Sequence, residues 1–576
     1  MREIPRRTFC SLLAASAATA PGWSAAKRGG AAGGPVPDGD DVVVRTRNEL
    51  EAAFRDLSAG DSIFITAEGA PYRTRGWLDI DVENVRVYGP EIPTLVQPAN
   101  GANVGGIRIG KHARVRDVLV HGVGYHGNRD RQSSGAERLH GISVVDAQNV
   151  ILDGCQVRNT GPRSHGDGGS GISVTSRCSN VRISHNQISD FGDRGVQVAG
   201  ANHVVFGNVI ADGLDRPVSA DLWDEDSRDY TALTVSVFGN LLGDSYEGSL
   251  VGAAQQIGSG ANDGYLSVVG NVGFGAHKSF CHIRGPNRFK NVSIQNNVGH
   301  QDADGLETPQ KTFAGIAIDP DGGDTLSIRN NELYDYSGRG IEINGDIRDL
   351  SVQQNTVSSV GLEGIRLVGA SRGLVGDNQI HETGLAGIRL SRTRETSVTD
   401  NYVQRAGALG IRVDGGDGTT GNDVTGNYVV ENGWNRDPVP PAIRVEERGV
   451  RVRGNAIRQN GSPAVVEDAN KDAGANLVEA NWADGERPWR IAGPETRVRG
   501  NTPAHDVHRG LSPDGDRQVS LRFDRPYADP PRLTYARGGS SIQSESYQQD
   551  GDGNVVGVTL ALAGETTVVD VFVGGR

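Results

Sequence analysis

A repeat of about 23 residues limits the folds open to this chain more than any other feature of its sequence. Between Leu326 and Val413, four segments each carry a short β-branched run, an Asn, a polar turn and a Gly-Ile pair that begins an alternating strand. The recurring residues are Asn331, Asn355, Asn378 and Asn401, and Ile341, Ile365, Ile388 and Ile411. Both series are spaced by 24, 23 and 23 residues, so two separate landmarks share one period.

This period predicts an all-β chain folded as a right-handed parallel β-helix. Each unit holds short alternating runs, which are typical of strands, and no segment long enough for a helix. One coil cannot bury its own inner face, but stacked coils share a continuous core. The Asn fits a turn with left-handed backbone, and its side-chain amide can bond the equivalent Asn amide of the next coil. The Gly fits a tight bend. A leucine-rich repeat would need several Leu and a helical segment per unit.

The composition agrees with a solenoid and limits the partners. The 576 residues include 81 Gly, 36% are apolar, and the formal net charge is −13. Thin cores with many turns need small residues. The acidic balance argues against nucleic acid as a partner, and no apolar run is long enough to span a membrane. Only six of the basic residues are Lys, which is typical of a halophilic host.

The N-terminal residues 1–26 are predicted to be an export signal. Arg6 and Arg7 precede an Ala-rich, mildly apolar run, which resembles a twin-arginine signal, and an ordinary secretory signal is the alternative. Residues 27–41 form a Gly/Pro-rich linker. We therefore expect a secreted, extracellular protein that works as a monomer.

The β-helix is predicted to cover residues 42–508, with structures that close both of its ends. The segment from Thr46 to Ala59 reads as a short capping helix, because Thr46 and Glu49 form a capping box. Such a cap covers the exposed strand edges of a first coil. From 509 to 576 the strands are longer and lose the period, which predicts a small C-terminal β-sandwich.

Three cysteines remain after the signal. Cys155 and Cys178 are 23 residues apart, so we expect them to stack on neighbouring coils as core thiols rather than as a disulfide.

Irregular coils place the predicted site between about 120 and 310. The Asn spacing there varies from 22 to 34 residues, and extra residues must leave the coil as loops, where sites are built. Turns before successive strands should stack on one face of a groove. We expect this groove to bring together Asp130, His165, Asp167, Asp193 and Arg194. Asp167, Asp190 and Asp193 are the candidate Ca²⁺ ligands, although Asp and Gly are also common turn residues.

Residues 233–298 resemble the central coils of family 1 pectate lyases. The similar phrases are Thr234-Val235-Ser236, Ser249-Leu250-Val251-Gly252, Asn262-Asp263-Gly264, Gly270-Asn271 and Asn296-Asn297. Lys278-Ser279-Phe280 stands where the family has Arg-x-Pro, and Arg284-Gly285 lies near a second family Arg. The resemblance places the chain in the pectin-lyase-like superfamily. It implies cleavage of an acidic polysaccharide by β-elimination, with Ca²⁺ as a possible cofactor.

The chemistry of β-elimination indicates which residues would act. Negative charge builds on the uronate carboxylate, so a cation must neutralise it while a base removes the neighbouring proton. Lys278 is the candidate base and Arg284 the second catalytic residue. His282, Arg194, His165 and Arg129 are candidate substrate-binding residues. A Lys acts as a base only when burial or cationic neighbours lower its pKa.

Two other functions stay open at this stage. A glycoside hydrolase would use Asp167 with Asp193 or Asp190 as its paired carboxylates. A non-catalytic surface protein would keep the scaffold and bind glycan or other partners, because a fold does not determine a function.

Overall fold

The computed structural model describes most of residues 37–574. Within that range it does not describe 38, 90–91, 93, 97–104, 128–138, 162–168, 221–233, 246–247, 255–264, 302–312, 416–419, 435, 437, 459–462, 468–473, 485–488, 492–495, 502–505, 512–517, 528–531, 537–540 and 564–568. The predicted export signal therefore lies outside the described residues, as does most of the predicted linker.

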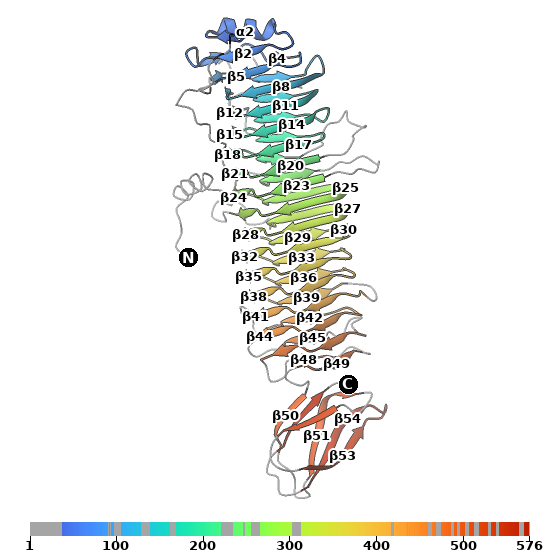
Figure 1. Ribbon diagram of the computed structural model, residues 1–576. Helices are drawn as coiled ribbons and strands as arrows, with labels where there is room; N and C mark the ends of the chain where they lie inside the picture. The colour runs from blue at the N-terminus through green and yellow to red at the C-terminus, as the bar shows by residue number, and fades with distance from the viewer. Residues whose placement is uncertain are drawn as a thin grey trace. The chain divides into compact units, whose positions relative to one another are not determined.

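Parallel strands stack coil upon coil in three ladders (Figure 1). Ladder 1 contains β4 (Leu78–Ile80), β7 (Ile107–Ile109), β10 (Ile142–Val144), β13 (Ile172–Val174), β16 (Val196–Val198), β19 (Val218–Ser219), β22 (Val251–Ala254), β25 (Cys281–Gln295), β27 (Ile316–Arg329), β29 (Ile341–Asn344), β33 (Ile365–Val368), β36 (Ile388–Ser391), β39 (Ile411–Asp414), β42 (Ile443–Val445), β45 (Val465–Glu467) and β48 (Trp489–Arg490). In the regular coils its strands β29, β33, β36 and β39 begin at the Ile of the Gly-Ile landmark.

Ladder 2 follows ladder 1 in each coil. It contains β1 (Val42–Val44), β2 (Ser62–Ile65), β5 (Arg86–Tyr88), β8 (Val115–His121), β11 (Ala147–Asp153), β14 (Ser179–Ser184), β17 (His203–Phe206), β20 (Thr234–Phe238), β23 (Tyr265–Val269), the second halves of β25 and β27, β31 (Leu350–Gln353), β34 (Leu374–Gly376), β37 (Ser397–Thr399), β40 (Asp423–Thr425), β43 (Arg451–Arg453), β46 (Leu477–Glu479) and β49 (Arg497–Arg499). Because β25 and β27 run through both ladders, and short β30 (Asp346–Ile347) pairs with β27, the two ladders form one 33-stranded sheet.

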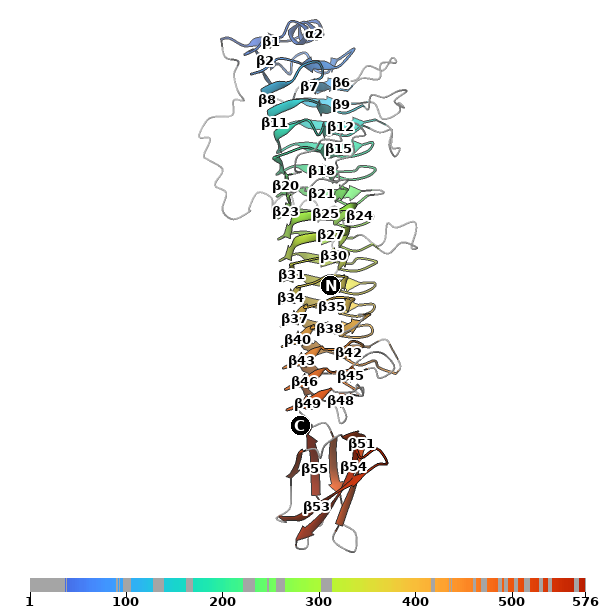
Figure 2. The same cartoon turned by 90° about the vertical axis from the view of Figure 1, so that its right-hand side faces the viewer.

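Ladder 3 is a separate 16-stranded sheet (Figure 2). It contains β3 (Tyr72–Arg73), β6 (Thr94–Val96), β9 (Gly124–His126), β12 (Gln156–Thr160), β15 (Gln187–Phe191), β18 (Val209–Ala211), β21 (Leu241–Ser245), β24 (Val272–Ala276), β26 (Val298–His300), β28 (Glu332–Tyr334), β32 (Thr356–Val360), β35 (Gln379–Thr383), β38 (Tyr402–Ala406), β41 (Tyr428–Val430), β44 (Ala456–Arg458) and β47 (Trp482–Ala483).

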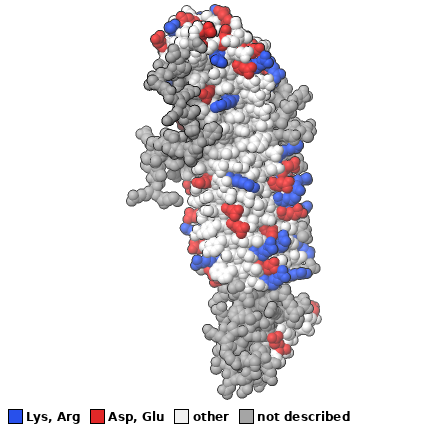
Figure 3. Space-filling view, viewed as in Figure 1, with Lys and Arg blue, Asp and Glu red and all other residues white. Residues whose placement is uncertain are grey.

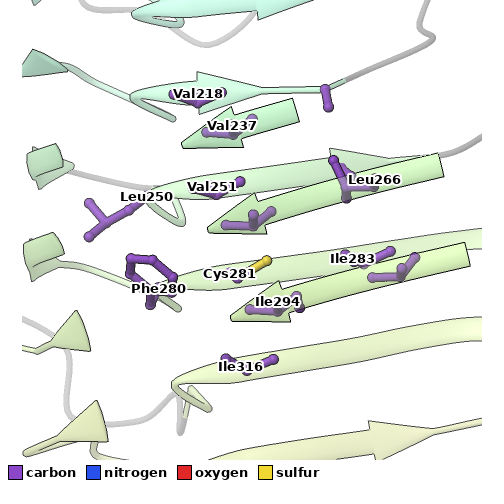
Figure 4. Packing of buried hydrophobic residues seen from close by; sticks show 14 of the residues in the cluster. Val218, Val237, Leu250, Val251, Leu266, Phe280, Cys281, Ile283, Ile294 and Ile316 are labelled. Atoms are coloured by element: carbon purple, nitrogen blue, oxygen red, sulfur yellow. The ribbon is translucent and has the colours of Figure 1, made fainter. Parts of the chain in front are cut away.

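The core is built from columns of identical or similar side chains. In ladder 1, Ile142 pairs with Ile172, which pairs with Val196, and all three are buried. Alternate residues of each short strand point inward, so every coil adds Val, Ile or Leu to the core (Figure 4). Each such side chain stabilises the fold by about 1.5–3 kcal/mol, and the alternation fixes which residues face outward.

Buried asparagines form the ladder of side-chain amides that the repeat predicts. Each donates from Nδ2 to the Oδ1 of the next, at 2.8–3.0 Å from Asn331 to Asn427. The series runs through Asn186, Asn208, Asn240, Asn271, Asn297, Asn331, Asn355, Asn378, Asn401, Asn427, Asn455, Asn481 and Asn501. The prediction that these asparagines are left-handed is wrong: the preceding residue adopts that backbone, as Gln354 does at φ 57°.

The Gly before each Ile is required for its size rather than for a bend. A Cβ on Gly364 would lie 2.5 Å from Ile380 Cγ2, and one on Gly387 would lie 2.3 Å from Val403 Cγ1. Both partners are core side chains of ladder 3. The turn into ladder 1 thus packs directly on the opposite sheet, and neither glycine has a positive φ.

A helix packs on the first strands, as the sequence predicts. Helix α2 (Arg47–Arg55) begins after Thr46, whose capping box with Glu49 is formed, and ends four residues before the predicted Ala59. Leu50 and Phe54 are buried, and the helix contacts β1, β3 and β4.

Strands near the C-terminus change from parallel to antiparallel pairing. Two three-stranded sheets are formed by β50 (Asp506–Leu511), β52 (Arg532–Ala536) and β55 (Val569–Gly574), and by β51 (Gln518–Tyr527), β53 (Ser541–Gln549) and β54 (Val555–Ala563). Leu521, Val558 and Leu560 are buried. Two antiparallel sheets agree with the predicted small sandwich.

The cysteines are buried free thiols, but they do not stack as predicted. Cys155 takes the Asn position of its coil, and its N–H donates to Asn186 Oδ1 at 2.8 Å. Cys178 lies in the turn between β13 and β14. The coil here is 30 residues long, from Ile142 to Ile172, so a separation of 23 residues does not return to the same position. Burial raises the pKa of both thiols, to about 12 and about 11, which makes them unreactive.

Candidate functional site

Two Asp-Arg pairs lie at the same position in consecutive coils, where the chain turns into ladder 1. Asp193-Arg194 precedes β16, and Asp215-Arg216 precedes β19. The N–H of Asp215 donates to the carbonyl of Asp193 at 3.0 Å, which aligns the two turns. Both carboxylates are buried. Each lies near its own guanidinium, at 3.5 Å from Arg194 and 3.8 Å from Arg216, so the charges are balanced within each pair.

The next coil has small residues at the corresponding positions. A Cβ on Gly248 would lie 2.3 Å from Asp215 Oδ1, and one on Gly252 would lie 2.4 Å from Arg216 Cδ and 2.7 Å from its Nε. The side chains of Asp215 and Arg216 therefore lie over this coil. We call residues 248–253, whose Gly248 and Gly252 lie under these two side chains, the small-residue coil. Its glycines let the Arg216 guanidinium reach the strand that pairs with β25.

His282 faces outward on the other side of the small-residue coil. It pairs in register with Gly252 on one side and Ala317 on the other, so small residues flank it along ladder 1. Its Nε2 lies 3.2 Å from Asp319 Oδ2. Asn344 donates to Asp319 Oδ1 at 2.7 Å and so fixes the carboxylate. The result is a chain of contacts from Asn344 through Asp319 to the imidazole.

Asp319 is held in its ionised form. Burial alone would raise its pKa, but the hydrogen bonds from His282 and Asn344, with the nearby charge of Arg339, hold the pKa below its usual value. An ionised carboxylate only accepts hydrogen bonds. Nε2 of a neutral His282 therefore carries the proton, and Nδ1 is the acceptor nitrogen.

Lys278 and Arg284 lie on either side of His282 in the chain. Lys278 is half-buried in the turn before β25, and its N–H donates to the carbonyl of Gly248 at 3.3 Å. The Lys278 carbonyl accepts from the buried Gln301 Nε2 at 3.1 Å, which fixes the turn. Arg284 is exposed and in register with Asp319. Both predicted catalytic residues thus come from the coil that carries His282.

The remaining predicted residues are not all brought to this face. Arg129, His165 and Asp167 lie outside the described residues, as does Asp130. Asp190 is the next-to-last residue of β15 on ladder 3, with a φ of 53°, and its charge acts on His126. Three residues further on, Asp193 is buried beside Arg194. Asp190 and Asp193 therefore stand at the two ends of one turn.

The described residues do not fit a Ca²⁺ site. Asp193 and Asp215 each lie near a guanidinium, Asp319 lies near an imidazole, and no group of three or more potential metal ligands comes together in the part of the chain that the structure describes. Ca²⁺ binding through Asp167, Asp190 and Asp193 stays a prediction, because Asp167 is outside that part.

Sequence reasoning missed Asp215, Arg216, Asp319 and Asn344. One signal was present: Asp193-Arg194-Gly-Val and Asp215-Arg216-Pro-Val repeat the same phrase one coil apart. No local pattern marks Asp319 or Asn344, which meet His282 only through the strand register.

The regular coils also carry a dense network of ion pairs on ladder 1, although the repeat alone suggests that they are scaffold. Figure 3 shows basic and acidic side chains interleaved along the coils from β29 to β45. Arg339 and Arg389 both pair with Glu363, at 2.8 and 3.2 Å. Further pairs connect Arg366 to Glu342, Arg389 and Arg412 to Asp414, and Arg412 and Arg444 to Glu446.

This network predicts an acid-sensitive contribution to stability. Burial would raise the pKa of Glu363, but Arg339 and Arg389 hold it below the usual 4.5. A lowered folded-state pKa stabilises the fold above about pH 4.5, and this stability is lost as the pH falls through the folded value. Because Glu363 is 2% exposed, Glu363→Gln should lower the free energy of unfolding by about 3 kcal/mol at pH 7 and by less at pH 3. Unfolding midpoints at both pH values test this, and an equal difference at both would contradict it.

Comparisons with known proteins agree with the fold. A family model for the right handed beta helix region matches residues 110–223 and 282–437. No curated protein matches the chain. Among solved structures, a tailspike protein mutant of E. coli bacteriophage HK620 is similar at 10% identity and a TM-score of 0.41, covering 94% of this chain and 91% of that one.

Two further similar solved structures are named as enzymes. One is the catalytic unit of a GH87 alpha-1,3-glucanase from Streptomyces thermodiastaticus, at 10% identity and a TM-score of 0.32, covering 78% of this chain and 70% of that one. The other is a mannuronic acid specific polysaccharide family 6 lyase from human gut microbiota, at 11% identity and a TM-score of 0.33. The match covers 77% of this chain and 86% of that one.

The described part of the chain holds no helix long and apolar enough to cross a membrane. Its strand ladders, its buried Asn series and the match to the family model lead to one conclusion. The chain is folded as a right-handed parallel β-helix.

Proposed function

We propose that this protein is an extracellular polysaccharide lyase that cleaves an acidic polysaccharide by β-elimination on ladder 1. The observation that supports this most is the arrangement around the small-residue coil. The Arg216 guanidinium lies over Gly252, and His282, in contact with Asp319, stands on the neighbouring strand. A cation and an oriented imidazole are thus one strand apart, about 4.8 Å along the stack.

These two groups match the needs of the reaction. The base removes the C5 proton of a uronate, a double bond forms between C4 and C5, and the C4–O bond breaks; the leaving oxygen takes a proton from water. Charge builds on the uronate carboxylate in the transition state, and a fixed cation stabilises it there. His282 is our candidate base, because Asp319 holds its Nε2–H and leaves Nδ1 for the substrate proton.

The predicted residues take supporting roles in this scheme. Lys278 and Arg284, on the same coil as His282, would bind substrate carboxylates beside the cleaved bond. Arg194, two coils before the small-residue coil, would bind a sugar further along the chain. Lys278 stays the second candidate for the base, and no step of the scheme passes through a metal ion.

The proposal is tested by the absorbance of an unsaturated uronide. Polygalacturonate and alginate are incubated with the protein, in high and low salt, with added Ca²⁺ and with a chelator. We expect product from one of the uronans. In Lys278→Ala, weaker substrate binding should raise KM more than it lowers kcat, whereas a base would mainly lower kcat. Silence on every uronan with Ca²⁺ present would overturn the lyase proposal.

One observation favours hydrolysis as the second candidate. Asp193 and Asp215 are buried carboxylates one coil apart on the same face, and retaining glycosidases hold two carboxyl groups about 5 Å apart. Release of reducing ends without unsaturated product would identify this activity. A protein that binds uronans but releases neither product would instead be a non-catalytic glycan-binding scaffold.

A further inference from the structure

Ladder 3 carries a column of outward-facing aromatic side chains near its C-terminal end. Tyr402 pairs in register with Tyr428, Tyr428 with Ala456, and Ala456 with Trp482. Tyr428 is 36% exposed and Trp482 is 44% exposed. The column stands on a different sheet from the site on ladder 1, and the proposed reaction does not use it.

The Tyr402 and Tyr428 rings stack along the ladder. Their centroids are 5.5 Å apart and their planes differ by 25°. The Tyr402 hydroxyl donates to Gln404 Oε1 at 3.1 Å, which fixes the ring. Tyr428 therefore rests on Tyr402 on one side and presents its other side to the next coil.

That next coil has only a methyl group at this position. Ala456 separates Tyr428 from Trp482, so these two residues lie two strands apart, about 9.6 Å along the ladder. A saturated six-membered ring midway between them would lie about 4.8 Å from each aromatic plane, within the range of ring stacking. The spacing leaves room for one sugar ring above the Ala456 methyl group.

Polar groups lie beside this gap at the level where a sugar carries its hydroxyls. Arg458 and Asp484 follow Ala456 and Trp482 by two residues, so they lie on the same outward face. Their side chains form an ion pair at 3.8 Å, and Arg458 is 61% exposed. A guanidinium and a carboxylate side by side can donate to and accept from neighbouring hydroxyls.

We propose that the gap between Tyr428 and Trp482 binds a pyranose ring of a polysaccharide chain, as an accessory site apart from ladder 1. Aromatic faces on both sides contact the C–H faces of the sugar, and the Arg458–Asp484 pair contacts its edge. Stacking does not depend on the sugar's charge, so neutral and acidic pyranoses both fit. A nucleotide base would also stack, but the net charge of −13 disfavours its phosphate backbone.

The test is a titration with hexamers of galacturonate, of mannuronate and of a neutral β-glucan, followed by tryptophan fluorescence and calorimetry. The wild type should bind at least one hexamer. Trp482→Ala should weaken that binding at least tenfold, because it removes one wall of the gap. Ala456→Leu should do the same by filling the gap, and its outward position leaves the core unchanged.

The matched control is Tyr265→Ala. Tyr265 is 39% exposed and faces outward on ladder 2, so its loss should leave the binding unchanged. The proposal is overturned if the wild type binds no hexamer, if Trp482→Ala and Ala456→Leu bind as the wild type does, or if a uridine oligonucleotide binds and the sugars do not. The neutral β-glucan hexamer has no uronate carboxylate and cannot undergo β-elimination, so its binding is independent of whether the protein is a lyase.

Discussion

His282→Ala is expected to lower the rate of unsaturated-uronide formation by about 1,000-fold, within the range that a general base contributes. The acceptor nitrogen of the imidazole is set by a half-buried contact, since its Nε2 lies 3.2 Å from Asp319 Oδ2. Its removal leaves the cation of Arg216 in place but nothing to take the C5 proton. Initial rates at saturating uronan measure the loss, which should fall on kcat rather than on KM.

Two variants decide whether the imidazole acts as the base. Asp319→Asn keeps the shape of the side chain but can donate to Nε2, so it should favour the other tautomer and also lower kcat. His121→Ala is the matched control, because His121 also contacts a carboxylate, with Nδ1 at 3.0 Å from Asp153 Oδ2, but lies on ladder 2. Full activity in His282→Ala, or an equal loss in His121→Ala, would rule out this role for His282.

Asn355→Ala is expected to lower the free energy of unfolding by about 4 kcal/mol. Asn355 Oδ1 accepts from the N–H and Nδ2 of Asn331 at 3.0 and 2.9 Å, and its Nδ2 donates to the Ile328 carbonyl at 2.9 Å. Alanine removes the acceptor of the Asn331 N–H and of one Nδ2 proton and the donor to the Ile328 carbonyl, while Asn331 Nδ2 keeps only its bond to the Ile294 carbonyl. Each buried hydrogen bond lost in this way costs about 1–3 kcal/mol. Urea denaturation followed by circular dichroism measures the change.

Gln379→Ala provides the comparison for that measurement. Gln379 is an exposed residue at the start of β35 on ladder 3, so its loss should change stability by less than about 0.5 kcal/mol. If the two variants unfold at the same urea concentration, water replaces the lost amide and the Asn series is not a source of stability.

The sequence was sufficient to predict the architecture because every coil repeats the same physical requirement. An inward β-branched column, an amide that bonds its copy and a Gly that fits against the opposite sheet all recur with one period. The reasons for two of these features differ from the expected ones. Gln354, before Asn355, takes the left-handed backbone, and Gly364 is small because Ile380 touches it. No sequence pattern within a single repeat unit indicates either the left-handed residue or the glycine contact.

The candidate site was less accessible to sequence reasoning. His282 and Lys278 lie within residues 233–298, the segment marked by the resemblance to pectate lyases, and Arg194 lies in one of the turns predicted to stack on one face. Asp319 lies 37 residues from His282, and Gly252 shows its role only when the Arg216 side chain lies over it. Such contacts depend on the lengths of the coils between them, which are irregular in this part of the chain.

The one-way order of the Asn series has a consequence for how such a protein can change its length. Every interior amide receives from the coil before it and donates to the coil after it, so each is an equivalent link. Removal or duplication of one complete 23-residue unit would join two equivalent links and leave every amide partnered. A coil without an Asn fits only at an end of the series. The coil with Cys155 at the Asn position is an example, because it lies just before Asn186, where the series starts. The number of coils is therefore open to gain and loss by unequal recombination, whereas the content of each coil is not.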